Sequence, residues 1–117
     1  MTKEELLNRT KVFAHNCVKT ALSLPKNSLG KHIENQLIRS STSVAANYRA
    51  ACKAQTKPGF ISKLSIVIEE ADETEFWLEF IIDEKLLISK EVSELKSEAH
   101  ELASIFISSR RTAQRNL

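Results

Sequence analysis

The spacing of apolar residues predicts four helices, over residues 3–24, 29–55, 58–84 and 89–111. In each segment apolar side chains return every three or four residues, which is the period of one face of an α-helix. The fourth segment shows the pattern most clearly, because its apolar residues alternate by four and three as in a coiled-coil seam: Ile88, Val92, Leu95, Ala99, Leu102 and Phe106. Each helix would be about 30–40 Å long.

The residues between these segments are typical of helix ends. Thr2 and Glu5 form a capping-box pattern, and Asn27 or Ser28 is a suitable N-cap for the second helix. Pro58 suits a first helical turn, and Ser89 can cap the fourth helix. Because the connections are short, consecutive helices should be antiparallel. We therefore predict an all-α protein, a single domain over residues 1–117 with an up-down-up-down antiparallel four-helix bundle.

The third segment is apolar on more than the one face that a bundle requires. Leu64, Val67, Ala71 and Leu78 form its core stripe, and a second apolar group lies on the opposite side, interleaved with carboxylates: Ile66, Phe76, Trp77 and Phe80. An apolar patch mixed with charge indicates a subunit interface. Trp77 would be its main anchor, although it could instead cap the core of a single subunit.

The second segment has the complementary character. Its serines and alanines allow another helix to approach closely, and residues 26–58 carry six basic side chains and one acidic. Residues 59–85 carry two basic and eight acidic side chains, so Arg39 and Arg49 are natural partners for those carboxylates, within or between subunits. The predicted oligomer interface comprises Arg39, Ser43, Asn47, Arg49, Ile66, Glu69, Glu70, Glu73, Trp77 and Phe80.

In the fourth segment the charge pattern favours exposure to solvent. Glu91, Glu94, Glu98 and Glu101 recur by three and four residues, and we expect them to form a solvated face.

Two stretches resemble a known family. "QLIRSSTSVAANYRA" (36–50) and "FISKLSIVIEEADETEFWLE" (60–79), joined by a "KPG" turn, are similar to the bacterial four-helix-bundle proteins encoded in intervening sequences of 23S ribosomal RNA genes. The resemblance covers roughly residues 6–107. Many members carry an Arg-Arg pair, a Ser-Ile-Pro-x-Asn block and a Glu-Gly pair. Arg39, Ser43, Val44 and Asn47 match that pattern, whereas Ala45 replaces the proline and Ala50-Ala51 replaces Glu-Gly, which suggests a subfamily.

The resemblance implies an up-and-down bundle that assembles as a homopentamer. A related bundle, the accessory variability protein of diversity-generating retroelements, binds a reverse transcriptase and nucleic acid through a basic surface. The resemblance therefore raises RNA, DNA and a nucleic-acid enzyme as candidate partners besides a second copy of the chain itself.

The sequence lacks the patterns of an enzyme. None of His15, His32 and His100 has a glutamate three residues before it, as di-iron bundles require. Two glycines in total exclude a glycine-rich phosphate loop, and the run Ser40–Ser43 lacks a nucleophile elbow. Cys17 and Cys52 fall at apolar helical positions, as buried small hydrophobes do. We expect no catalysis, no cofactor and no metal.

Basic residues cluster near the ends of the predicted second helix and in the C-terminal segment. They are candidates for contact with nucleic-acid phosphates, or alternatively simple solubility charges: Lys26, Lys31, Lys53, Lys57, Arg110, Arg111 and Arg115. Few aromatic residues are available for base stacking. The sequence thus favours a homo-oligomeric accessory or scaffold protein that contacts RNA, DNA or a nucleic-acid enzyme. The alternative is a protein–protein interaction module without nucleic-acid affinity.

The sequence also bears on location. Its N-terminal residues, "MTKEELLNRTK", are too polar for a signal peptide, and no apolar run approaches the length of a membrane span. We expect a cytoplasmic protein that does not contact a membrane.

Overall fold

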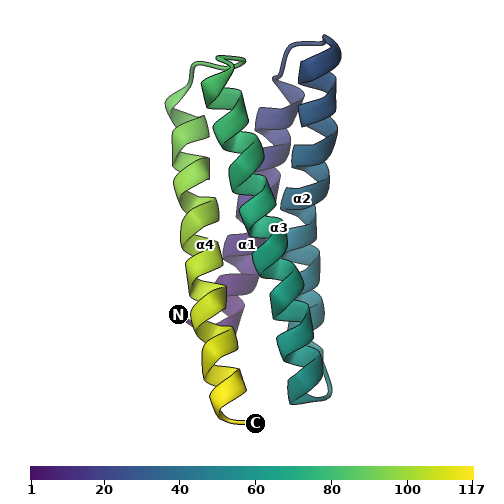
Figure 1. Ribbon diagram of the computed structural model, residues 1–117, viewed down its shortest axis with the longest axis vertical. Helices are drawn as coiled ribbons and strands as arrows, with labels where there is room; N and C mark the ends of the chain where they lie inside the picture. Colours follow the sequence, from purple (N-terminus) through teal and green to yellow (C-terminus); the bar gives the residue numbers. More distant parts are fainter.

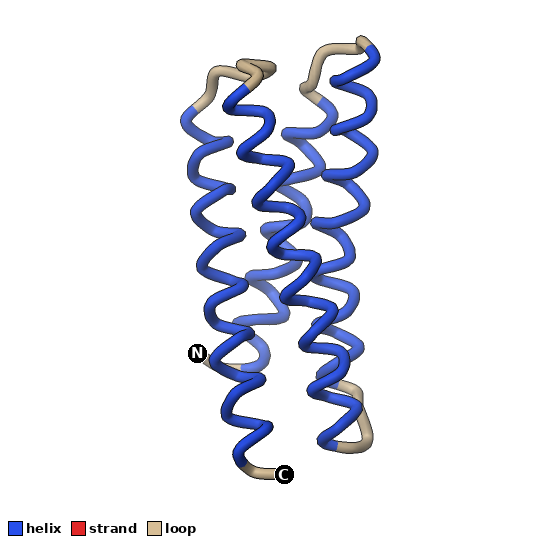
Figure 2. The backbone as a smooth tube through the Cα atoms, in the orientation of Figure 1, coloured by secondary structure: helices blue, strands red, loops and turns tan.

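The computed structural model describes residues 1–117 and confirms the predicted fold class. It contains four helices and no strand: α1 (Lys3–Leu22), α2 (Ser28–Cys52), α3 (Lys57–Asp83) and α4 (Lys90–Arg115). Consecutive helices run in opposite directions and lie side by side in an elongated bundle of 47 × 21 × 20 Å (Figure 1). All three connecting loops lie at the two ends of the bundle (Figure 2), so the long sides are made of helices alone.

Side chains of the residues before each helix satisfy its first backbone N–H groups. The Thr2 hydroxyl accepts from the Glu5 N–H at 3.1 Å, and the Glu5 carboxylate accepts from the Thr2 N–H, which completes the capping box. Asn27 caps α2 by accepting from the Gly30 N–H at 2.8 Å. Thr56 caps α3 with Pro58 in its first turn, and Ser89 caps α4.

Gly30 is required for the tight connection between α1 and α2. A Cβ atom at this position would lie 1.9 Å from the carbonyl oxygen of Pro25, a distance no pair of such atoms tolerates. The missing side chain thus lets the loop pass directly over the first turn of α2.

The core is one cluster of twenty buried apolar residues drawn from all four helices and the loop after α1. Phe13 of α1, Leu37 of α2, Leu78 of α3 and Phe106 of α4 are each no more than 2% exposed. Burying an aliphatic or aromatic side chain of this size contributes about 1.5–3 kcal/mol relative to leaving it in water. The apolar periodicity that predicted the helices therefore also predicted which faces meet in the core.

Two features of α4 differ from the prediction. Ile88 was placed in the apolar seam but lies in the loop before the helix, 91% exposed, because α4 begins only at Lys90. At the other end α4 continues to Arg115 rather than residue 111, and Ala113 in this last turn is buried. The prediction ended too early because this last turn is polar apart from Ala113, whose small side chain is its only buried contact.

Candidate interaction surfaces

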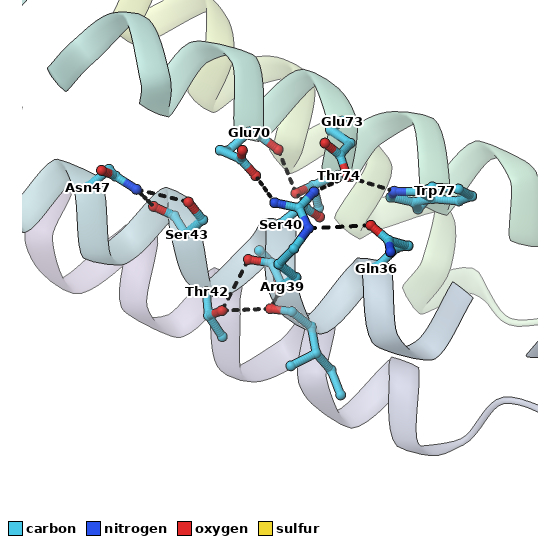
Figure 3. Close-up of polar contacts among 12 residues, drawn as sticks. Gln36, Arg39, Ser40, Thr42, Ser43, Asn47, Glu70, Glu73, Thr74 and Trp77 are labelled. Carbon is cyan, nitrogen blue, oxygen red and sulfur yellow. Dashed lines mark hydrogen bonds and ion pairs between the residues drawn. The ribbon is translucent and has the colours of Figure 1, made fainter. Parts of the chain in front are cut away.

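Arg39 joins α2 to α3 within one chain. Its guanidinium donates through Nη1 to Oε2 of Glu70 at 3.0 Å and through Nη2 to Glu73, while Nε donates to Oε1 of Gln36 (Figure 3). The hydrogen bond to Glu73 is the main reason why the pKa of Arg39 is raised. The predicted pairing of α2 arginines with α3 carboxylates therefore occurs inside the subunit for Arg39.

Trp77 is tied to the same carboxylate. Its indole Nε1 donates to Oε2 of Glu73 at 3.0 Å, as Figure 3 shows. Partial burial would raise the pKa of Glu73, but the hydrogen bonds from Trp77 and Arg39 outweigh it, so that pKa is lowered. The indole ring packs edge-on against His32 and Phe76 and against the buried core, and its side chain is partly exposed.

The serines of α2 permit a close approach to α3. Ser40 and Thr74 are both fully buried, and the Thr74 hydroxyl donates to Oγ of Ser40 at 2.9 Å. Asn47 instead donates to the hydroxyl and carbonyl oxygens of Ser43, one turn earlier on the same helix. Ser43 and Asn47 are partly exposed, and their side chains form their hydrogen bonds within α2.

The outward side of α3 keeps apolar surface in contact with solvent. Phe76 is 51% exposed, and Ile66 and Phe80 are partly exposed. Glu69 and Asp72 lie exposed among them, and none of the ion pairs in the chain involves either carboxylate. We call the set Ile66, Glu69, Asp72, Phe76 and Phe80 the α3 stripe.

Arg49 does not join Arg39. It lines a groove of about 840 Å³ on the other side of α2, between α2 and α1. The same groove holds three lysines, His15 and no acidic side chain. The structure therefore assigns the two α2 arginines of the predicted interface to different sides of the bundle.

The seven basic residues proposed for phosphate contact divide between the two ends of the bundle. Lys26 and Lys31 lie beside the α1–α2 loop, where Lys26 pairs with Glu34 at 3.1 Å. Lys53, Lys57, Arg111 and Arg115 lie at the opposite end, about 37 Å away given 25 residues of α2. There the Lys57 ammonium donates to the carbonyl of Asn116 at 3.1 Å, and Arg110 donates to the Ser65 hydroxyl.

A third charged cluster was not predicted. Arg9 of α1 binds Glu98 of α4 through two parallel hydrogen bonds of 2.7 Å and pairs with Glu101 at 3.1 Å. These bonds raise the pKa of Arg9 although burial opposes them. The expectation of a solvated glutamate face is therefore wrong for Glu98, which is partly buried, whereas Glu101 pairs with Arg9 but stays exposed as expected. The three-residue spacing of Glu98 and Glu101 indicated that both lie on one face of α4. It did not identify their partner Arg9, which lies 89 residues before Glu98 in the sequence.

No group of three or more His, Cys, Asp and Glu side chains is placed to hold a metal ion. His100 contacts Glu75 at 3.2 Å on the exposed surface between α3 and α4. None of the four helices has the length and apolar character needed to cross a bilayer.

Fold and surfaces together define an antiparallel four-helix bundle with a charged and apolar exterior. The model of the 23S rRNA-intervening sequence protein family matches residues 2–108, and the chain belongs to that family. A crystal structure of a protein of unknown function from the S23 ribosomal protein family of Bacteroides thetaiotaomicron is similar, with 30% identity and a TM-score of 0.85. The match covers 95% of this chain and 99% of that one. No curated protein matches the chain.

Proposed function

We propose that this protein is a non-enzymatic helical scaffold that assembles from several copies and contacts RNA or DNA through the basic end of the assembled bundles. The α3 stripe carries the proposal, because a half-exposed phenylalanine beside unpaired carboxylates is more typical of a subunit interface than of free surface. The resemblance to family members that form pentamers leads us to expect five copies.

Assembly is tested by light scattering on the purified protein at micromolar concentration. We expect a mass several times that of one chain, and a monomer would overturn the proposal. Phe76→Ala should lower the mass, since the side chain is exposed and the substitution leaves the core intact. Ile88→Ala is the matched control, because Ile88 is an even more exposed hydrophobe that lies outside the stripe. If the Phe76→Ala and Ile88→Ala variants have equal masses in solution, Phe76 is not part of the interface.

The nucleic-acid contact rests on the end of the bundle where α2 ends and α3 begins. Lys53, Lys57, Arg111 and Arg115 lie there together with Glu4 and Glu5 of the first turn of α1, and the sequence has no acidic side chain between Glu34 and Glu69 or after Glu101. Repetition of this end around an assembly would produce a large basic surface. Such a surface binds the phosphates of RNA or DNA without sequence specificity. The same property would let it bind the nucleic-acid substrate of an associated enzyme.

Titration of labelled RNA and DNA at several salt concentrations tests this contact. We expect the logarithm of the binding constant to fall linearly with the logarithm of salt concentration, by about 0.7–0.9 per neutralised phosphate. Substituting Lys57, Arg111 and Arg115 by glutamine should reduce the slope, while glutamine at Lys31 and Lys90, at the opposite end, should not. Absence of binding even at about 50 mM salt would favour the alternative, a protein–protein interaction module.

A further inference from the structure

The groove between α1 and α2 has a basic rim. Five side chains that are cationic or can become so surround it, and no carboxylate lines it: Lys3, Lys11, His15, Arg49 and Lys53. Unlike Lys26, Arg39 and Arg9, none of the four permanently charged members takes part in an ion pair. Like charges gathered without counter-charges indicate that an anionic partner completes the site.

The floor of the groove indicates what kind of partner this is. It is formed by small and aliphatic side chains: Leu7, Ala14, Val18, Ala45, Ala46 and Cys52. No Phe, Tyr or Trp lines the groove, so a nucleic-acid base would find no stacking surface. Alanines at adjacent positions of α2 let the backbone of another helix approach closely, and an apolar floor suits the apolar side of that helix.

The chain itself carries a helix of this description. The α3 stripe combines Ile66, Phe76 and Phe80 with the unpaired carboxylates of Glu69 and Asp72, and it contains no basic residue. We infer that the groove of one copy receives the N-terminal part of the α3 stripe of a second copy, namely Ile66, Glu69 and Asp72, with Ile66 against the small-residue floor and the two acidic side chains against the basic rim. This inference rests on the proposed homo-oligomeric function and assigns the two surfaces that meet.

The groove lies level with the N-terminal end of the α3 stripe, whereas Phe76 and Phe80 lie further along the bundle. Ser40 of α2 contacts Thr74 and Arg39 contacts Glu70, so Thr42 at the upper edge of the groove is level with about residue 70 of α3. The α2 part of the groove, residues 42–53, therefore lies level with the first half of α3, where Ile66 and Glu69 face solvent. In a ring whose axis is parallel to the bundles, each level of a subunit meets the same level of its neighbour.

The two surfaces also lie on different sides of one subunit, so the contact is head-to-tail. The groove belongs to α1 and α2, while the stripe consists of exposed and partly exposed residues of α3. Head-to-tail contacts of this kind close into rings when the rotation between neighbours divides a full turn.

Charge reversal tests the pairing. We expect Lys11→Glu with Arg49→Glu, and separately Glu69→Lys with Asp72→Lys, each to reduce the mass in solution towards that of a single chain. The four substitutions combined restore opposite charges across the contact and should return the mass to the wild-type value. Lys31→Glu with Lys90→Glu is the matched control, because both lysines are exposed, lie outside the groove and should leave the mass unchanged.

A second, uncharged variant tests the close approach. Ala46→Trp fills the groove and should lower the mass, whereas Ser93→Trp, at an exposed position of α4, should not. Circular dichroism of every variant establishes that the helices are retained. A monomeric wild type would overturn the proposed function itself. Two outcomes with an oligomeric wild type would overturn only the pairing of groove and stripe. In the first, the groove substitutions leave the mass in solution unchanged. In the second, the four combined substitutions fail to restore it.

Discussion

Thr74 of α3 donates a hydrogen bond to Ser40 of α2 at 2.9 Å, and neither side chain has any solvent exposure. The Thr74 hydroxyl also lies 2.7 Å from the Glu70 carbonyl of its own helix, so it has two acceptors for one proton. Each hydroxyl is small enough to fit where the helices approach closely. This contact explains why α2 presents serine at a position where a bundle helix normally has leucine.

We expect the size of the residue at position 40 to matter more than its hydroxyl. Ser40→Ala leaves Thr74 with the Glu70 carbonyl as acceptor and should reduce the free energy of unfolding by no more than about 1 kcal/mol. Ser40→Leu forces extra methyl groups into a filled space and should cost about 1–3 kcal/mol. Urea denaturation at fixed protein concentration measures both. Equal effects of the two substitutions would show that the hydrogen bond, rather than the space, is decisive.

The Glu73 carboxylate should make stability depend on pH. Its folded pKa is lowered, so its contribution is present above the unfolded carboxyl pKa of about 4.3 and is lost as the pH falls through the lower folded pKa. Glu73→Gln should therefore lower the free energy of unfolding by up to about 1 kcal/mol at neutral pH, with a smaller difference near pH 3. Glu91→Gln, which removes an exposed carboxylate without an ion pair, serves as the control. A difference that grows on acidification would contradict the assigned direction.

Arg9 and Glu98 should be coupled more strongly than an ordinary surface pair. Their two side chains are 22% and 27% exposed and share two parallel hydrogen bonds, a geometry that places the pair at the upper end of surface ion pairs, about 1 kcal/mol. A double-mutant cycle with alanine at both positions measures this coupling. The same cycle on Lys90 and Glu94, which are 88% and 62% exposed, should give about 0.3 kcal/mol. Equal coupling free energies from the two cycles would mean that the Arg9–Glu98 pair contributes no more to stability than an exposed surface pair.

The two thiols should differ in reactivity. Cys17 has no solvent exposure, and burial raises its pKa to about 12, with a weaker opposing effect from a hydrogen bond with Ser41. A rise of this size above the ordinary value lowers the thiolate fraction about a thousandfold, and the thiolate is the reacting form. The Cys52→Ala variant should therefore react with a thiol reagent only as fast as it unfolds. Rapid labelling of this variant in the native state would show that Cys17 is accessible.

Much of the fold followed from the order of residues alone, because apolar periodicity reports directly which face of a helix is withdrawn from water. The caps at Thr2 and Ser89 were equally local, since each satisfies amides within its own first turn. Ile88 was misplaced because it continues the periodic pattern although the helix behind it has not yet begun. The interface residues and the number of copies stay predictions.

The sequence by itself determined that four amphipathic helices form, that α3 is apolar on two sides, and that acidic and basic residues occupy adjacent segments. Only the tertiary structure decided which charges meet. It paired Arg39 with Glu70 and Glu73 inside one chain, turned Arg49 towards α1, joined Arg9 to Glu98, and divided the basic residues between two ends. The physical reason is that helix periodicity depends on neighbours a few positions away, whereas ion pairs depend on the rotation and direction of helices far apart in the chain.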